Sequence, residues 1–161
     1  MSIKIFVMDV DGTLTNGKIY MGNDGEIFKA FNVKDGYGIH DILVPTGILP
    51  IIITGRTSRI VKKRCEELGI DELYQGIYDK KSCLEEVLQK YRCSFEQVAY
   101  IGDDINDIPC MRIIKENHGS IGCPADAVES VKKMADFVSL YNGGEGAVRE
   151  YIEWIITNKS L

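Results

Sequence analysis

The sequence has 161 residues, 45% of them hydrophobic and 27% charged, and a formal net charge of −5. These values predict one globular domain spanning residues 1–161, and the acidic balance argues against nucleic acid as a partner, because phosphate backbones are bound by basic surfaces. The five cysteines form no CxxC pair, a pattern typical of reduced thiols rather than a zinc site.

The chain begins with a predicted buried strand, residues 3–8, that ends at two carboxylates. In an extended chain, residues i and i+2 point to the same side, so Asp9 and Asp11 project together from its end. Two like charges this close require a cation between them or a proton on one of them, and a divalent cation with oxygen ligands meets that need. A turn cap before Gly12 explains the pair equally well when it is taken alone.

Two alternating runs follow, residues 18–21 and 26–31, and a Gly/Asn/Asp turn separates them. This pattern predicts a β-hairpin. Because it follows the acidic pair directly, we expect residues 17–31 to form a flap over the same end of the sheet.

Strands and helices alternate along the rest of the chain, which is typical of a parallel sheet covered on both faces. We therefore predict an α/β domain of three layers. Residues 142–157 are expected to form a glycine-rich tail followed by a helix. Further strands are predicted at residues 47–53, 73–76, 98–101, 119–123 and 136–139, and helices at 34–44, 58–68, 82–91, 148–156 and through 111–115.

The apolar runs do not suit a membrane. The longest, residues 47–53, is too short to span a bilayer and contains Pro50. Asp9 interrupts the N-terminal run and no basic region precedes it, so no signal peptide is predicted. We expect a cytoplasmic protein with no membrane partner.

Polar side chains follow four of the predicted apolar runs. In parallel α/β sheets the carboxyl ends of the strands meet at one edge, where ligands bind. Taken alone, Thr54 is an ordinary turn residue and Lys80 an ordinary surface lysine, but their order and placement favour a shared site. The four groups are Asp9 with Asp11, Thr54 with Arg56, Lys80, and Asp103 with Asp104.

The residue types in these groups suit phosphoryl transfer. Asp9 is the predicted nucleophile, which attacks phosphorus and forms an aspartyl phosphate. Asp11 is the predicted acid and base, which protonates the departing alkoxide and then deprotonates the attacking water. Thr54 is expected to donate a hydrogen bond to a phosphoryl oxygen, and Lys80 to neutralise charge in the transition state.

The same groups predict a Mg²⁺ site, because carboxylate and carbonyl oxygens are the ligands that this cation prefers. Asp9, the carbonyl of Asp11, and Asp103 are the expected ligands. Asp104 and Asp107 are expected to orient these ligands or metal-bound water without binding the metal. The cation would offset the repulsion between the carboxylate nucleophile and the phosphate dianion.

With these motifs the sequence resembles the haloacid dehalogenase superfamily of phosphatases. DVDGT at residues 9–13 is similar to its first motif, ITG at 53–55 to its second, Lys80 to its third and GDDIND at 102–107 to its fourth. The resemblance implies a Rossmann-like domain, Mg²⁺ and an aspartyl-phosphate intermediate. No insertion here is large enough to be a cap domain, since the hairpin is the only extra element.

A capless subgroup gives the nearer resemblance, and its members act on phosphates of keto-deoxy sugar acids. The likeness implies a small-molecule sugar phosphate as substrate and a homotetramer in which a neighbouring subunit covers the active site. It is carried by KAFNVKDGYGI at residues 29–39, ITGRTS at 53–58, LYQG at 73–76 and GGEGAVRE at 143–150.

Two markers within this resemblance disagree about the substrate. Arg56 is placed to bind a substrate carboxylate, and it resembles enzymes for the eight-carbon 3-deoxy-D-manno-octulosonate 8-phosphate. Glu145 resembles enzymes for nine-carbon, sialic-acid-type 9-phosphates. We give Arg56 more weight because it adjoins a motif residue. Gly55 and Arg56 are therefore the expected substrate-binding residues, with Arg64 on the following helix as a further candidate.

Several alternatives stay open. Arg64 belongs either to the site or to a solvated basic face. Gly143, Gly144 and Gly146 form either a strap that enters a neighbour's site or a turn before the last helix. The whole domain also resembles non-catalytic modules appended to sugar-nucleotide synthetases of the acylneuraminate cytidylyltransferase type, and it shares an acid pair, a threonine and a lysine with receiver domains. The intact set of predicted catalytic residues argues against a non-catalytic module. The second acidic cluster, residues 103–107, argues against a receiver domain, which does not need one.

Overall fold

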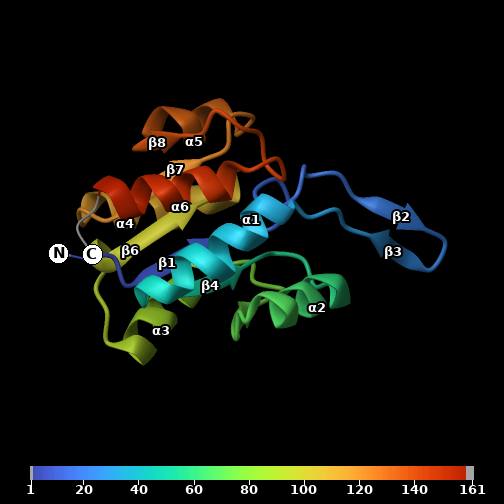
Figure 1. Ribbon diagram of the computed structural model, residues 1–161, viewed down its shortest axis with the longest axis horizontal. Coiled ribbons are helices and arrows are strands. Elements are labelled where there is room, and N and C mark those ends of the chain that lie inside the picture. Colours follow the sequence, from blue (N-terminus) through green and yellow to red (C-terminus); the bar gives the residue numbers. More distant parts are fainter. Residues whose placement is uncertain (1, 159–161) are drawn as a thin grey trace.

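The computed structural model describes residues 2–158, which form an α/β domain of three layers (Figure 1). Its six-stranded sheet has the order β5-β4-β1-β6-β7-β8 and all strands are parallel, as predicted. The strand β1 therefore lies between β4 and β6. The strands are β1 (Ile5–Met8), β4 (Leu49–Ile53), β5 (Glu72–Tyr74), β6 (Val98–Ile101), β7 (Ser120–Cys123) and β8 (Phe137–Val138).

Alternate residues of the strands face opposite layers of helices. On β1, Phe6 and Met8 pack with α2, α6 and the helical continuation of α1, whereas Ile5 and Val7 pack with α3, α4 and α5. Both faces of the sheet are covered, which explains why its strands are apolar without alternation. The helices are α1 (Val33–Tyr37), α2 (Arg59–Leu68), α3 (Lys80–Tyr91), α4 (Ile108–Glu116), α5 (Glu129–Met134) and α6 (Ala147–Asn158).

The predicted helix over residues 34–44 is not one regular α-helix, which corrects the sequence-based expectation. The helix α1 continues into a π-helical segment, Gly38–Leu43, and a 3₁₀ turn, Val44–Thr46. A Cβ at Gly36 would lie 2.4 Å from a side-chain atom of α2, and one at Gly38 would lie 2.9 Å from a side-chain atom of α6. The glycines let the segment pack closely against both helices, at the expense of helical regularity.

The predicted hairpin is present as β2 (Tyr20–Gly22) and β3 (Gly25–Phe28), which pair antiparallel outside the main sheet. Figure 1 shows it projecting from the end of the molecule toward which β6 points. No other segment within residues 2–158 stands apart from the sheet and its helices, so the described chain has no cap domain.

The glycine-rich segment before α6 is a turn packed against the loop after β1 of the same chain. The N–H of Gly144 donates to the carbonyl oxygen of Thr13 at 3.1 Å. A Cβ at Gly143 would lie 1.8 Å from the carbonyl oxygen of Gly12, so a larger residue does not fit there. Of the two alternatives that the sequence leaves open, the structure supports the turn, which holds the loop that follows the acidic pair.

The helices differ from the predictions in one further element. The helix α5 has no clear signal in the sequence, because its six residues, ESVKKM, are mostly polar and too few for a helical period. No helix among residues 2–158 is both long and apolar enough to cross a membrane.

Candidate active site

The carboxyl ends of β1, β4 and β6 bring the predicted polar groups together at one edge of the sheet. Asp9 directly follows β1, Thr54 directly follows β4, and Asp103 lies two residues beyond β6. Because β4 and β6 are the two neighbours of β1, these side chains meet without a long connecting loop. A shallow hollow of ≈ 190 Å³ at this edge is lined by Asp9, Asp11, Thr54, Gly55, Arg56, Asp104 and Asn106.

Lys80, the first residue of α3, is buried between two carboxylates. Its Nζ lies 2.8 Å from Asp9 Oδ1 and 2.8 Å from Asp107 Oδ1, and its side chain is 1% exposed. Burial opposes the charged form, but the two carboxylates outweigh burial and raise the pKa of Lys80 above its ordinary value. Lys80 is therefore a fixed cation beside the predicted nucleophile rather than a surface lysine.

Asp107 uses both carboxylate oxygens to hold its neighbours. Its Oδ1 accepts from Lys80 Nζ and from the hydroxyl of Tyr100 at 2.7 Å. Its Oδ2 accepts from the backbone N–H groups of Asp103 at 3.0 Å and Asp104 at 3.3 Å. Each oxygen already receives two hydrogen bonds, which supports an orienting role for Asp107 rather than a place among the metal ligands.

Asp103 lies against the loop that follows β1. Its Oδ1 accepts from Thr13 Oγ1 at 3.0 Å, and a Cβ at Gly12 would lie 2.0 Å from its Oδ2. Gly12 also has a φ of +92°, a backbone conformation that favours glycine. The glycine of the first motif is therefore required for the turn and for the close approach of Asp103.

Asp9, Asp103 and Asp107 form an acidic cluster whose oxygens fit a divalent cation. One oxygen from each lies within 4.8 Å of the others. Burial and the neighbouring carboxylates raise the pKa of Asp9 to about 6 and that of Asp103 to about 8, so Lys80 alone does not balance the cluster. Because Asp107 is already saturated, Asp9 and Asp103 are the side chains that would hold Mg²⁺. The Asp11 carbonyl stays a predicted ligand.

The Asp11 side chain does not belong to this cluster. Its Oδ1 lies 2.5 Å from Lys29 Nζ, and Lys29 also contacts Glu26 Oε2 at 3.0 Å. The hydroxyl of Ser58 donates to the other oxygen of Glu26 at 2.5 Å. The sequence-based site lacks these three residues, because Lys29 and Glu26 have the character of ordinary charged residues in an exposed hairpin. The one available signal is that Lys29 opens the KAFNVKDGYGI segment.

Thr54, Gly55 and Arg56 all line the hollow, as does Asp104. Thr54 is 2% exposed, and its backbone N–H donates to the carbonyl oxygen of the last residue of β5 at 2.9 Å. Arg56 is exposed at the rim, where its side chain is accessible to a substrate. Asp104 accepts from the next backbone N–H at 2.7 Å and so begins the short 3₁₀ turn before α4.

Arg64 does not line this hollow within its own chain, and its place among the substrate-binding residues stays a prediction. Its guanidinium lies 5.7 Å from the ring centroid of Phe31 and donates to Glu67 Oε2 at 3.2 Å. The helix α2 starts at the site and runs away from it. Arg64 lies five residues beyond the first residue of α2, which corresponds to about 7.5 Å along the helix axis. Glu145 lines a separate hollow with Arg149.

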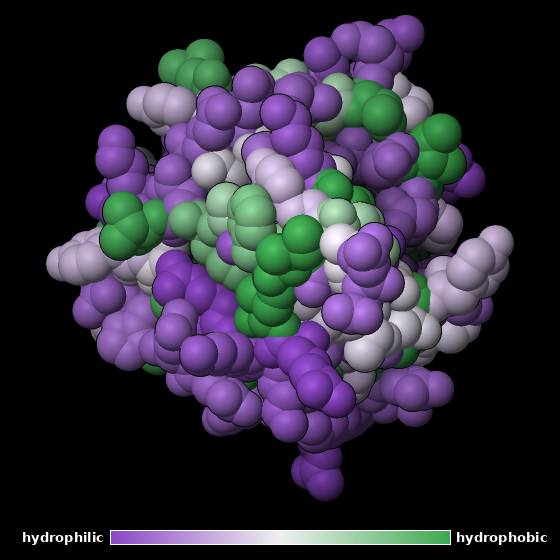
Figure 2. All heavy atoms as spheres, turned by 90° about the vertical axis from the view of Figure 1, so that its right-hand side faces the viewer, coloured by the Kyte–Doolittle hydropathy of each residue, from purple (hydrophilic) through white to green (hydrophobic). Residues whose placement is uncertain are grey.

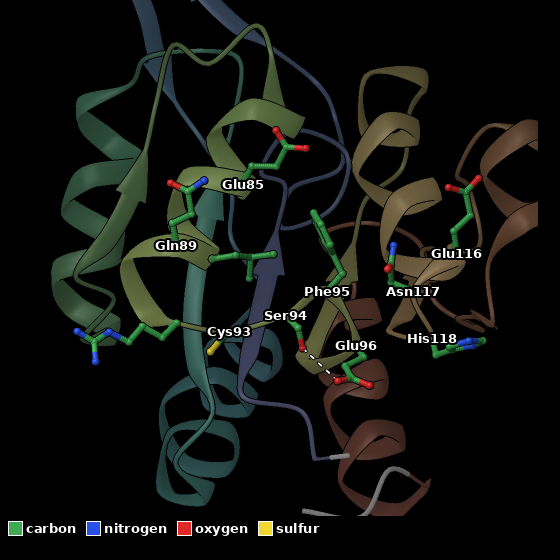
Figure 3. A pocket seen from close by; sticks show the side chains of 11 residues that line it. Glu85, Gln89, Cys93, Ser94, Phe95, Glu96, Glu116, Asn117 and His118 are labelled. Atoms are coloured by element: carbon green, nitrogen blue, oxygen red, sulfur yellow. Dashed lines mark hydrogen bonds between the residues drawn. The ribbon is translucent and has the colours of Figure 1, made fainter.

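A wider hollow, of ≈ 630 Å³, lies at the opposite edge of the sheet, where β6 and β7 begin (Figure 3). Figure 3 shows Glu85, Glu116 and His118 spread around its rim rather than converging on one point, with a hydrogen bond of 3.3 Å from Ser94 to Glu96. None of the predicted catalytic residues lines it. The chemistry at the strand ends, not the size of a cavity, therefore locates the site.

Known sequences show the family to which this chain belongs. Residues 41–113 match the family of haloacid dehalogenase-like hydrolases. Over 155 residues the chain is 44% identical to the 3-deoxy-D-manno-octulosonate 8-phosphate phosphatase of Escherichia coli strain K12. The aligned part covers 96% of this chain and 80% of that protein.

Solved structures give the same result. The 3-deoxy-D-manno-octulosonate 8-phosphate phosphatase of Yersinia pestis matches with a TM-score of 0.90 at 44% identity, covering 96% of this chain and 81% of that one. The enzyme of Moraxella catarrhalis, in complex with a magnesium ion, a phosphate ion and a KDO molecule, matches with a TM-score of 0.90 at 38% identity, covering 98% and 87%. This chain therefore belongs to the haloacid dehalogenase-like hydrolases and, within them, to the family of these phosphatases.

Proposed function

We propose that this protein is a Mg²⁺-dependent phosphatase that hydrolyses the phosphomonoester of a keto-deoxy sugar acid, 3-deoxy-D-manno-octulosonate 8-phosphate. The observation that carries the proposal is the arrangement at the end of β1, where Lys80 holds Asp9 and a second carboxylate, Asp11, lines the same hollow. The names of the relatives and the KDO molecule in the Moraxella structure support the choice of substrate.

The reaction follows from the different surroundings of the two carboxylates. In the first step an oxygen of Asp9 attacks phosphorus, the bond from phosphorus to the sugar oxygen breaks, and Asp11 gives its proton to that oxygen. In the second step Asp11 takes a proton from water, the water oxygen attacks the aspartyl phosphate, and inorganic phosphate leaves with Asp9 restored. Asp11 must remain accessible for both transfers, and its side chain is 19% exposed.

The surrounding residues suit a phosphoryl group. Lys80 places a positive charge beside Asp9, and Thr54 lines the hollow with a hydroxyl that donates to a phosphoryl oxygen. Held at Asp9 and Asp103, Mg²⁺ supplies the charge that lets a phosphate dianion approach a carboxylate. The raised pKa values of Asp9 and Asp103 support this requirement for added positive charge.

Arg56 supports the eight-carbon substrate. It lines the hollow beside Thr54, where a planar guanidinium suits bidentate binding of a carboxylate. Glu145 lines a separate hollow with Lys34 and Arg149. Arg56 is therefore the better guide to specificity. The nine-carbon 9-phosphate is the competing substrate to compare with the eight-carbon 8-phosphate.

A homotetramer in the cytoplasm, with a neighbouring subunit covering the hollow, is part of the proposal. The hairpin exposes apolar side chains, with Met21 at 59%, Ile27 at 61% and Phe28 at 48%. Figure 2, which faces the hairpin end, shows hydrophobic residues gathered at the centre of a mostly hydrophilic surface. Apolar patches with a polar rim are typical of interfaces. Light scattering should give the mass of four chains, and the mass of one chain would contradict the tetramer.

Phosphate release from a panel of sugar phosphates, with and without Mg²⁺, tests the proposed activity. We expect the wild type to hydrolyse the eight-carbon substrate only with Mg²⁺. Asp9→Asn should lose activity by on the order of 10³-fold or more, because the amide is not a nucleophile. Asp71→Asn, which alters an exposed carboxylate outside the hollow, is the matched control and should keep wild-type activity.

Each outcome of this assay has a distinct meaning. Equal release by Asp9→Asn and the wild type, or no release by the wild type, would contradict the phosphatase mechanism. Faster release from the nine-carbon substrate than from the eight-carbon one would overturn only the choice of substrate and the weight given to Arg56.

A further inference from the structure

Lys29 is a second buried lysine at the site, and the reaction described above gives it no task. It follows β3 at the base of the hairpin, and its side chain is 1% exposed. Its ammonium lies 2.5 Å from Asp11 Oδ1 and 3.0 Å from Glu26 Oε2. A buried ammonium is unfavourable unless it is paired, and here two carboxylates share it.

The first turn of α2 anchors Glu26 from the other side. Ser58 is the N-cap of this helix, and its Oγ accepts from the N–H groups of Ile60 at 3.2 Å and Val61 at 3.4 Å. The same hydroxyl donates to Glu26 Oε1 at 2.5 Å. A continuous series of contacts therefore runs from α2 through the hairpin to the acid and base. Its members, which we call the Lys29 network, are Ser58, Glu26, Lys29 and Asp11.

The Lys29 network fixes one oxygen of Asp11 and leaves the other available. Among residues 2–158, Lys29 is the one side-chain donor to the Asp11 carboxylate, and it binds Oδ1. The Asp11 side chain is 19% exposed and lines the hollow beside Asp9. Proton transfer requires the acid within hydrogen-bond distance of the departing oxygen, and a displacement of about 1 Å lowers such rates by roughly 100-fold.

We propose that Lys29 is a positioning residue for proton transfer: by holding Oδ1 of Asp11, it directs Oδ2 toward the oxygen that leaves phosphorus. This inference rests on the proposed phosphatase activity and deepens it. A lysine that only closed the base of the hairpin would affect all substrates alike. A positioning lysine affects most strongly the substrates whose leaving group needs a proton.

Aryl phosphates with different leaving groups separate these two roles. p-Nitrophenolate departs without a proton, whereas the more basic phenolate needs one, and neither substrate carries a carboxylate for Arg56. For Lys29→Met we expect kcat/KM to fall roughly tenfold to 100-fold with phenyl phosphate and less than about threefold with p-nitrophenyl phosphate. Lys29→Arg restores a cation and should recover part of the loss. Lys63→Met, at an exposed lysine of α2, is the control and should change neither value.

The possible outcomes separate the inference from the activity on which it rests. Parallel losses on both substrates, or no loss with phenyl phosphate, would overturn the positioning role while leaving the phosphatase in place. A wild type that hydrolyses neither aryl nor sugar phosphates would overturn the proposed function and the inference with it. If circular dichroism shows that Lys29→Met does not fold, Glu26→Gln tests the same network, because glutamine has nearly the same size and shape as glutamate but no charge. Its loss should again be larger with phenyl phosphate, and parallel losses would overturn the role.

Discussion

Two buried lysines flank the acidic pair Asp9 and Asp11, and they come from different parts of the molecule. Lys80 and Lys29 each have a side chain that is 1% exposed, and each contacts two carboxylates. Lys80 begins α3, which packs against the central sheet. Lys29 stands at the base of a hairpin whose strands pair only with each other. Carboxylates two residues apart are therefore held by separate structural units.

The two lysines also differ in the balance of charge around them. One ammonium, that of Lys80, faces the cluster of Asp9, Asp103 and Asp107. Burial and the neighbouring carboxylates raise the pKa of Asp9 and of Asp103, as expected where positive charge is lacking. Lys29 faces two carboxylates, and one of them receives a further bond from a serine hydroxyl. We therefore expect changes near Lys80 to alter stability and metal binding, and changes near Lys29 to alter proton transfer.

Lys80→Met should have the largest effect on stability. It leaves Asp9 and Asp107 buried without their cation, and breaking a buried ion pair in this way costs roughly 3–5 kcal/mol of unfolding free energy. Urea denaturation at neutral pH without Mg²⁺ measures it. Lys81→Met is the matched control, because Lys81 is 43% exposed and pairs with Glu85 at 3.8 Å on the surface, a contact worth about 0–1 kcal/mol. Similar losses for the two variants would contradict the buried ion-pair account.

Asp103→Asn should make the metal-free protein less sensitive to pH. The pKa of Asp103 is raised from 3.8 to about 8, so between these values the folded state binds more protons than the unfolded state. The free energy of unfolding must then decrease as pH rises through this range. The amide does not ionise, so in EDTA the melting temperature of Asp103→Asn should fall less than that of the wild type between about pH 5 and pH 8. Each kcal/mol of unfolding free energy that the variant does not lose corresponds to roughly 2–4 °C.

The same variant tests the metal site. Added Mg²⁺ should raise the melting temperature of the wild type and of the control Asp71→Asn, because a ligand that binds only the folded state stabilises it. It should have little effect on Asp103→Asn. A variant that keeps the wild-type response to pH and to Mg²⁺ would show that Asp103 is not part of the charge imbalance.

The catalytic edge of the sheet could be predicted because local sequence signals determine it. An apolar run followed by Asp9, Thr54 or Asp103 marks a strand end, and a parallel sheet brings neighbouring strand ends together. The family, the parallel sheet and, for residues 2–158, the absence of a cap domain are confirmed. The receiver domain and the non-catalytic module lose support, because the family matches and the predicted catalytic residues gather at one edge.

The Lys29 network could not be predicted, because its contacts depend on how the hairpin folds back on the sheet. Glu26 and Lys29 belong to an element whose other residues are largely exposed, and residue type does not show which charged side chain turns inward. Arg64 was a candidate for the opposite reason. Its charge suits the substrate, but a helix that follows a strand of a parallel sheet runs back from the carboxyl end of that strand, and Arg64 lies against Phe31 instead of lining the hollow of its own chain.

Ser58→Ala should have the smallest effect on proton transfer, because Ser58 acts on Asp11 only through the hairpin residues Glu26 and Lys29. Loss of an N-cap hydroxyl costs roughly 1 kcal/mol of unfolding free energy, which urea denaturation measures. The change also removes the bond to Glu26, so the Lys29 network loses its outer anchor. We expect kcat/KM with phenyl phosphate to fall about two- to fivefold, while the value with p-nitrophenyl phosphate stays within error.

Asn32→Ala is the control for this last prediction. Asn32 caps α1 by accepting from the N–H of Lys34 at 2.8 Å, and its side chain forms no hydrogen bond with the Lys29 network. Asn32→Ala should lose about as much free energy of unfolding as Ser58→Ala and leave the ratio of the two kcat/KM values unchanged. If both variants change the ratio equally, general loosening of the fold controls proton transfer, and the hairpin has no separate hold on Asp11. If only Ser58→Ala changes it, the hold extends from Asp11 to the first turn of α2.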